Sequence, residues 1–246
     1  MAHQYGRYLS MSKQPSTNQV LTHAGLVLKR LSLTTDNPFF VALRDGSMSL
    51  GQFRTSQEQF SFAVDFFPRP MAALIGRIPE PALRLDILHN LVEEHGEFNE
   101  HHFHKTTFKK FLRSIDSAPD ALEKLSPWPC LRAFNSVLTT SCVLDELEVG
   151  VACMGIIEFA FASCSAAIGS NVVARAWVAA DQLVHYKLHA QIDERHAQEF
   201  FNVVEPLWNH PERRYFVEQG LELGAYILDR LYRDLHRTIM LPSTPS

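Results

Sequence analysis

The strongest constraint on the fold is a run of apolar and small residues over positions 149–173 that carries a single charge, Glu158. The run is long enough to cross a membrane. It is nevertheless rich in Gly, Ala, Ser and Cys, and no second run accompanies it. We therefore interpret it as a buried core helix and expect no membrane partner. A carboxylate buried in such a helix is costly unless another group pairs with it, so Glu158 also indicates a site.

The rest of the chain has helical periodicity, because apolar residues recur every three or four positions in most segments. No stretch alternates with period two for long enough to predict a strand. We expect helices over 17–31, from Pro38, 52–78 with a bend or break at Pro68 and Pro70, 82–94, 102–115, 132–168, 172–201 and 211–239. Residues 117–129, which include three prolines, are expected to form the longest loop. The prediction is an all-α single domain of about seven helices over 17–241, between a flexible tail (1–16) and a frayed end (242–246).

The charge balance and the absence of two phosphate-binding motifs argue against nucleic-acid and nucleotide binding. The chain has 23 basic and 27 acidic residues, a net charge of −4, and no large basic block, so nucleic-acid binding is not expected. It contains neither GxGxxG nor GxxxxGK, so we expect no nucleotide cofactor. Its N-terminus lacks a signal pattern.

Cys142, Cys153 and Cys164 would lie roughly 16 Å apart on one helix, too far for a disulfide. Free thiols in a reducing cytoplasm are the expectation for all four cysteines.

Chemistry-bearing residues gather in two histidine-rich segments. In the later one, His189, Asp193 and His196 follow one another at i, i+4 and i+7, within about 60° on one helix face. Two imidazoles and a carboxylate on one face form half of a site for a divalent metal. His185, one turn earlier, could orient such a ligand. A solvated polar face is the alternative, although the flanking apolar residues leave little room for one.

The earlier segment is denser and less specific. It contains Glu93, Glu94, His95, Glu97, Glu100, His101, His102 and His104. A surface role is more common for any one of these residues, but the group could supply one carboxylate and one imidazole. Together with Glu158 the total becomes three carboxylates and three imidazoles, a set that suits two iron or manganese ions. Metal charge would keep Glu158 ionised. No HExxH and no Glu-x-x-His pair occurs, which disfavours a zinc protease and a ferritin-like bundle.

On these residues the sequence resembles the haem-oxygenase-like diiron oxidases, over about positions 20–240. The segments that carry the resemblance are Asn37-Pro-Phe-Phe40, Asp45-Gly46, Phe53, Phe60, Phe67-Pro68, Asn90-Leu-Val-Glu-Glu94, His104 with Phe108 and Phe111, Gly155-Ile-Ile-Glu158 and His189-x3-Asp193-x2-His196. The resemblance implies a haem-oxygenase-like helical bundle. It also implies six metal ligands: Glu94, His104, Glu158, His189, Asp193 and His196. The three carboxylates among them, Glu94, Glu158 and Asp193, would be the catalytic residues. His101 is the alternative to His104, because the gap between Glu and His varies within the family.

The resemblance further implies a cofactor of two Fe(II) ions, with manganese as an alternative, and O₂ as co-substrate. A small amino-acid substrate is favoured over a fatty acid, and a homodimer and an external reductant are expected from similar proteins. Family members that make para-aminobenzoate from their own tyrosine have Tyr where this chain has Phe40, so that self-sacrificing reaction is not expected. Candidates to grip a substrate are Arg69, Arg77, Lys187 and Arg195. Candidates to line an aromatic pocket are Phe40, Phe67, Phe103, Phe159 and Phe161.

Other functions on the same fold make different predictions. A cofactor-independent oxidase or a thiaminase-like hydrolase would lack the full ligand set. An interaction protein would keep its binding after His189→Ala. A haem oxygenase would need a proximal histidine near the N-terminus, and His23 is the candidate.

Overall fold

The computed structural model describes residues 18–241, and within that range the chain is helical, with no β-strand. The α-helices are α2 (Gln19–Leu31), α3 (Leu33–Asp36), α4 (Pro38–Asp45), α5 (Leu50–Phe66), α6 (Pro68–Arg77), α7 (Leu85–Glu94), α8 (His104–Ser114), α9 (Pro119–Lys124), α10 (Pro129–Val143), α11 (Leu147–Ala174), α12 (Val184–Val204) and α13 (Pro211–Met240). Short 3₁₀ turns cover Pro81–Arg84, Gly96–Phe98, Glu100–His102 and Glu205–Leu207. The all-α prediction is confirmed, with more helices than the seven expected. The tails predicted at 1–16 and 242–246 lie outside the described residues.

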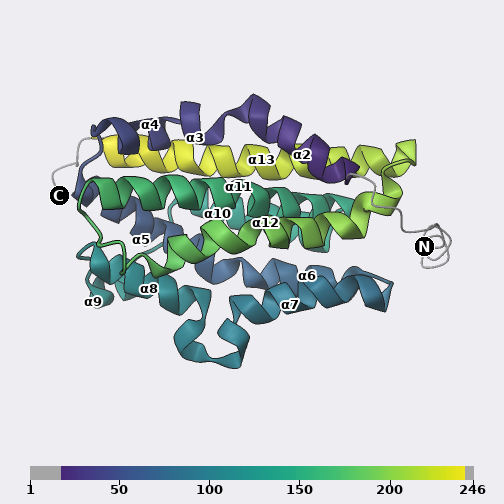
Figure 1. The fold of residues 1–246 in the computed structure, drawn as a ribbon, viewed down its shortest axis with the longest axis horizontal. Helices are drawn as coiled ribbons and strands as arrows, with labels where there is room; N and C mark the ends of the chain where they lie inside the picture. Colours follow the sequence, from purple (N-terminus) through teal and green to yellow (C-terminus); the bar gives the residue numbers. More distant parts are fainter. Residues whose placement is uncertain (1–17, 242–246) are drawn as a thin grey trace.

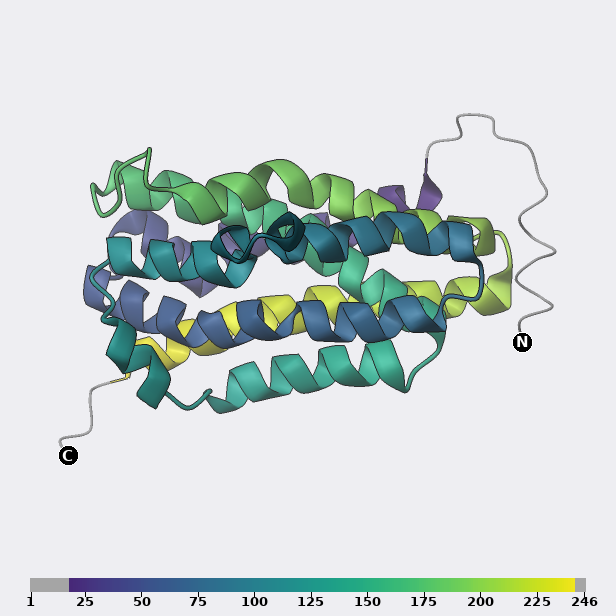
Figure 2. The same ribbon diagram turned by 90° about the horizontal axis from the view of Figure 1, so that it is seen from below.

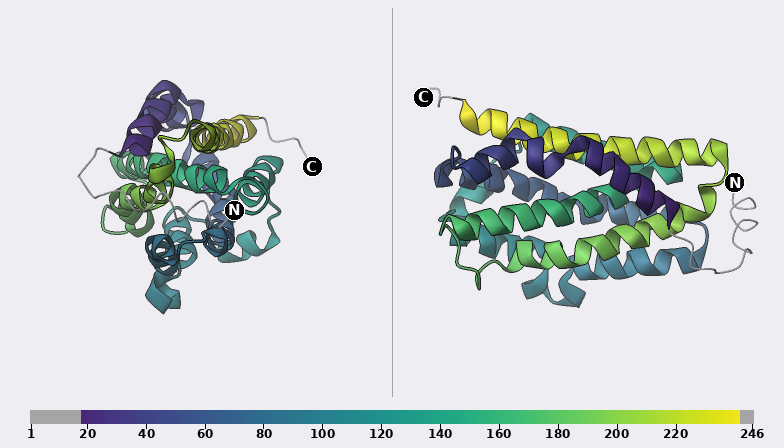
Figure 3. Two further views of the ribbon diagram at one scale, coloured as in Figure 1. Left: turned by 90° about the vertical axis from the view of Figure 1, so that its right-hand side faces the viewer. Right: turned by 45° about the horizontal axis from the view of Figure 1, so that its top comes forward.

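Most helices run along one axis, and α11 occupies the middle of the bundle (Figures 1 and 2). Helices α12 and α13 pack against α11 over much of its length. Seen end-on, α2 and α4 lie beside α13 on one side, and α7 and α8 lie on the opposite side (Figure 3). Helix α11 contains the apolar run. It is long and apolar enough to span a membrane, but 72% of its most apolar window is buried among the other helices.

Local sequence explains how several of the helices begin, and α4 begins at Pro38 as predicted. Asn37 caps α4, whose first residue is Pro38, and the Asn37 side chain accepts a bond from the Phe39 backbone. Ser49 caps α5 in a reciprocal arrangement with Gln52. The break between α5 and α6 falls at the predicted prolines, because a proline cannot donate the hydrogen bond that would continue a helix.

Three expected segments are wrong. The single helix predicted over 132–168 is two helices, because the chain turns at 144–146, where Arg77 donates to the backbone carbonyls of Cys142 and Asp145. The helix predicted over 172–201 is also broken, by a loop after Ala174 in which Ala176 has φ of 54°. The expected loop at 117–129 contains the short helix α9.

The first of these breaks changes the cysteine geometry. Cys142 lies on α10, whereas Cys153 and Cys164 lie on α11, so the three thiols do not share one helical stripe. All four cysteines are free thiols, as predicted.

Two glycines of α13 bring that helix into close contact with α11. A Cβ atom at Gly220 would lie 2.4 Å from the carbonyl oxygen of Val149. One at Gly224 would lie 2.6 Å from the carbonyl oxygen of Cys153. Because these neighbours are backbone atoms, a side chain at either position would push the helices apart.

We predict that Gly220→Ala lowers the free energy of unfolding by about 1–3 kcal/mol, the usual cost of overpacking a core. Gly25→Ala in α2 is the matched control, because a Cβ there meets no atom within 4 Å. It should raise stability by up to about 1 kcal/mol through helix propensity. Urea unfolding of the three proteins measures both effects, and a Gly220→Ala variant as stable as the wild type would contradict this account of the packing.

Candidate metal centre

Four helices bring the six predicted ligands together. Glu94 is the last residue of α7, His104 the first of α8, and Glu158 lies mid-way along α11. The remaining three lie along one buried face of α12: His189, Asp193 and His196. None of the six is more than 6% exposed. His101, the alternative to His104, is exposed on the 3₁₀ turn before α8 and lies outside this group.

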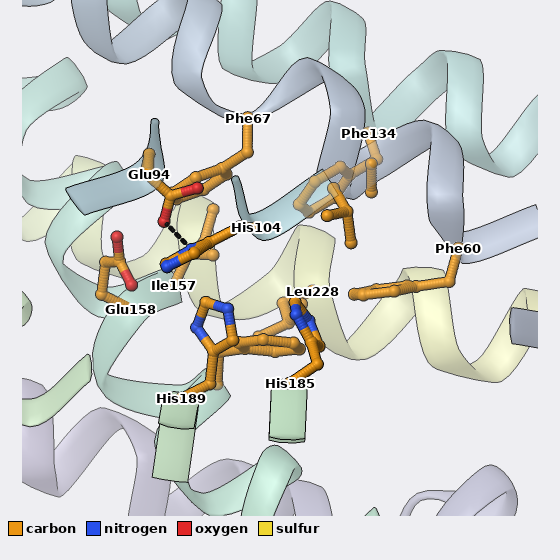
Figure 4. Close-up of a pocket in the computed structure, with 13 residues that line it drawn as sticks. Phe60, Phe67, Glu94, His104, Phe134, Ile157, Glu158, His185, His189 and Leu228 are labelled. Atoms are coloured by element: carbon orange, nitrogen blue, oxygen red, sulfur yellow. Dashed lines mark ion pairs between the residues drawn. The ribbon is translucent and has the colours of Figure 1, made fainter. Parts of the chain in front are cut away.

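The side chains form two linked sets. On one side, His104 Nδ1 lies 2.8 Å from Glu94 Oε1 (Figure 4). On the same side, His189 Nδ1 lies 2.9 Å from Asp193 Oδ1. On the other side, His196 Nδ1 lies 3.9 Å from both Glu158 Oε2 and Asp193 Oδ1. One ligand atom each from Glu158, Asp193 and His196 lie within 4.8 Å of one another, close enough to share one metal ion.

Several buried polar atoms of this group have no hydrogen-bond partner among the described residues. They are Glu158 Oε1, Asp193 Oδ2, His189 Nε2, His196 Nδ1 and His104 Nδ1, the last of which lies within ion-pair distance of Glu94. Buried polar atoms are normally paired, because leaving one unpaired costs about 1–3 kcal/mol. Carboxylate oxygens and imidazole nitrogens are also the donors that iron and manganese accept. The residues present therefore fit a divalent metal, which would occupy these free lone pairs.

The pKa values of Glu158 and Glu94 shift in opposite directions. Burial, reinforced by the charges of Asp193 and Glu94, raises the pKa of Glu158 well above its ordinary value. Burial also acts to raise the pKa of Glu94, but the adjacent His104 outweighs it and holds that pKa at about 2. The cluster without metal thus favours one proton on Glu158 and a negative charge on Glu94.

Glu93 is a further residue of the site that the sequence did not single out. His196 Nε2 lies 2.8 Å from Glu93 Oε2, and Arg195 donates to both oxygens of the same carboxylate at 2.7 and 2.8 Å. A carboxylate held by an arginine is an acceptor, so the imidazole proton of His196 belongs on Nε2. This leaves Nδ1 as the nitrogen free to bind a metal.

A small cavity adjoins the group, with a volume of about 50 Å³ (Figure 4). Its walls are mostly apolar. The lining residues are Phe60, Ala63, Val64, Phe67, Glu94, His104, Phe134, Ile157, Glu158, Phe161, His185, His189 and Leu228. This volume holds a few water molecules. Of these lining residues, Val64, Phe67 and Phe161 are half-buried.

The expected substrate-binding residues are only partly at the cavity. Of the five aromatic candidates, Phe67 and Phe161 line it, and the unforeseen Phe60 and Phe134 complete the aromatic wall. Phe40, Phe103 and Phe159 pack elsewhere, against Tyr232, His95 and Phe201 respectively.

None of the four cations expected to grip a substrate lines the cavity. Arg77 binds backbone carbonyls, and Arg195 binds Glu93 and Glu199. Arg69 lies over the Phe66 ring, and Lys187 is exposed. His23, the haem-ligand candidate, packs against Trp208 and does not reach the cavity either.

Comparison with known proteins places this site in context. A family model described as an iron-containing redox enzyme matches residues 54–225, a stretch that contains all six predicted ligands. The 4-aminobenzoate synthase of Chlamydia trachomatis serovar D is 23% identical over 119 residues, which are 48% of this chain and 50% of that protein. The chain thus matches half the length of this curated relative.

Solved structures show the fold more completely. A domain with a heme oxygenase-like fold from Shewanella denitrificans OS217 superposes with a TM-score of 0.74 at 15% identity, over 92% of this chain and 94% of that one. A CADD-like protein from Nostoc punctiforme PCC 73102 gives 0.75 at 14% identity, over 91% and 98%. A TenA homolog from Pseudomonas syringae pv. tomato gives 0.73 at 18% identity, over 95% and 99%. The haem-oxygenase-like fold predicted from the sequence is confirmed.

We predict that Glu158→Gln stabilises the metal-free protein at neutral and alkaline pH. The pKa of Glu158 is higher in the folded than in the unfolded protein, so the stability from its protonated form is complete below about 4.5 and is lost as the pH rises toward the folded value. Glutamine does not titrate and should raise Tm by at least about 2–4 °C at pH 8, with a smaller gain at pH 5. Glu194→Gln, an exposed position on α12, is the matched control and should show no such trend. An equal gain at both pH values would contradict the buried-carboxyl account.

Proposed function

The chain belongs to the iron-containing redox enzyme family, and from this premise we propose that it is a non-haem diiron oxidase that uses O₂ to oxidise a small organic substrate. The observation that supports this most strongly is the convergence of three carboxylates and three imidazoles from four helices at one buried point, with unpartnered lone pairs. In this proposal Glu94, His104, Glu158, His189, Asp193 and His196 hold two Fe(II) ions, for which Mn(II) is the alternative.

The donor set suits two divalent ions in charge and chemistry. Three carboxylates offset most of the positive charge of two such ions, and neutral imidazoles complete the ligand shells without adding charge. A bound divalent ion would favour the ionised form of Glu158, because a carboxylate in this apolar helix is stable only beside a positive charge. When bound, the two ions would supply electrons to O₂ and thereby activate it toward a C–H or N–H bond of the substrate.

The protein's own part is to orient ligands and exclude water. Arg195 and Glu93 together hold the His196 proton on Nε2, which keeps Nδ1 pointed into the cluster. The side chains of Phe60, Phe134 and Ile157 form apolar walls beside the ligands. A dry site protects reactive species from side reactions and strengthens every electrostatic interaction within it.

The cavity walls also bear on the substrate. We propose an apolar body at the point of oxidation, because the lining offers aromatic and aliphatic side chains and no cation. If the substrate is an amino acid, its side chain is apolar and lies inside the cavity, while its charged amino and carboxyl groups lie outside. The same lining would suit the alkyl chain of a fatty acid, which is the second candidate. A two-electron oxidation of either substrate supplies only two of the four electrons that reduce O₂ to water, so an external reductant for the other two is part of the proposal.

We predict that Glu158→Ala, His104→Ala and His196→Ala each lose at least one of two iron ions per chain after anaerobic Fe(II) loading and removal of free metal. His101→Ala is the matched control and should keep both ions, since His101 is exposed outside the cluster. Iron content is measured by atomic spectroscopy, and O₂ uptake with an electrode. If the three cluster variants retain the iron content and O₂ uptake of the wild type, the proposed site is wrong.

A further inference from the structure

One polar side chain in the cavity wall is not among the six proposed metal ligands. His185 lies one turn before His189 on α12, is 1% exposed, and lines the cavity. Its ring centroid is 4.4 Å from that of His189 and 6.2 Å from that of His104 (Figure 4). Its Nε2 atom is buried and has no hydrogen-bond partner among the described residues. This is an unsatisfied polar atom in an otherwise largely apolar wall.

A hydrogen-bond relay fixes which nitrogen of His185 carries the proton. The Thr107 hydroxyl lies 2.9 Å from the backbone carbonyl oxygen of His104 and 3.1 Å from His185 Nδ1. A hydroxyl has one hydrogen, and the carbonyl can only accept. Thr107 therefore donates to the His104 carbonyl and accepts from His185 Nδ1–H. The neutral ring then has a bare lone pair on Nε2.

The surroundings of this ring differ from those of the ligand cluster. His185 packs edge-on against Phe108 at 4.8 Å and Tyr186 at 5.3 Å between ring centroids. No carboxylate forms an ion pair with it among the described residues. It is also outside the compact set of Glu158, Asp193 and His196. Among the residues that line the cavity, His185 Nε2 is therefore an unpaired acceptor that does not belong to the six proposed metal ligands.

We propose that His185 Nε2 is the group that anchors the substrate, by accepting a hydrogen bond from an N–H or O–H of a mainly apolar molecule. This inference rests on the proposed function, since it takes the cavity beside the ligands as the substrate site. The substrate class is then an apolar body with one uncharged donor directed at His185. An analogue without the donor should bind less tightly, because it leaves His185 Nε2 unpaired. An analogue with an acceptor in place of the donor should also bind less tightly, because its lone pair faces that of Nε2. Thr107 is the positioning residue, because it acts only through the His185 tautomer.

The test uses pyrrole and furan as probes. Both are five-membered aromatic rings, but pyrrole donates one N–H and has no basic lone pair with which to bind iron, whereas furan has no donor. Calorimetric titration of the purified protein, before and after anaerobic Fe(II) loading, should give about tenfold tighter binding of pyrrole than of furan. In His185→Phe the two affinities should become equal, and His185→Gln, which retains an acceptor, should restore part of the preference.

Thr107 supplies a control that does not touch the probe. Thr107→Val removes the relay, leaves the ring free to place its proton on Nε2, and should reduce the preference for pyrrole. Thr107→Ser keeps the hydroxyl and should keep the preference. The ¹⁵N resonances of the His185 ring, assigned by comparison with His185→Phe, should show the proton on Nδ1 in the wild type and in Thr107→Ser only.

The outcomes separate this inference from the proposed function. Equal binding of the two probes by the wild type, binding of neither, or an unchanged preference in His185→Phe would overturn the role of His185 even if O₂ uptake is normal. A loss of iron in His185→Phe would also overturn it, by assigning the residue to the metal. If the probe preference behaves as expected but the protein takes up no iron, the donor-recognising cavity stands and the diiron proposal fails.

Discussion

An ionisable carboxyl in the middle of an apolar helix is stable only when groups from other helices face it. Glu158 is in this position, and the architecture around α11 supplies those groups. Helix α12 places Asp193 and His196 beside it, and α7 places Glu94 nearby. The close glycine-mediated contact between α11 and α13 fixes the opposite face of the same helix. The contacts that hold α11 in place therefore also determine the geometry of the candidate site.

The cluster carries a cost in the absence of metal. Its carboxylates repel one another, and burial raises the pKa of Glu158, so the fold keeps a proton there and leaves several lone pairs unpaired. Natural proteins accept such local destabilisation at sites whose function requires it. The surrounding side chains reduce the cost where they can: Arg195 supports Glu93, Glu93 supports His196, and Thr107 supports His185.

The sequence predicted those features that arise within one helix. The spacing of His189, Asp193 and His196 placed them on one face, and the single charge of the apolar run singled out Glu158. The helix breaks at 144–146 and after Ala174 carry no proline or glycine signal. The first depends in part on Arg77, more than sixty residues earlier, binding the carbonyls at the end of α10. No window of local sequence contains that contact.

The same limit explains which site residues were missed. Periodicity indicates that Phe60 and Phe134 are buried but does not tell which cavity they line. The sequence does not tell which of the adjacent residues Glu93 and Glu94 faces the site, because neighbouring residues on a helix point in different directions and either could point inward. In the relay from His104 through Thr107 to His185, Thr107 and His185 are 78 positions apart in the sequence. No rule based on residue spacing predicts a contact over that separation.

The central claim is that two iron ions lie among these six side chains. Its most direct test is a crystal structure of the protein loaded anaerobically with Fe(II), with data collected on both sides of the iron absorption edge. We expect two anomalous peaks per chain, both among the side chains of Glu94, His104, Glu158, His189, Asp193 and His196. Peaks elsewhere, or no anomalous signal at this cluster in fully loaded crystals, would contradict the account.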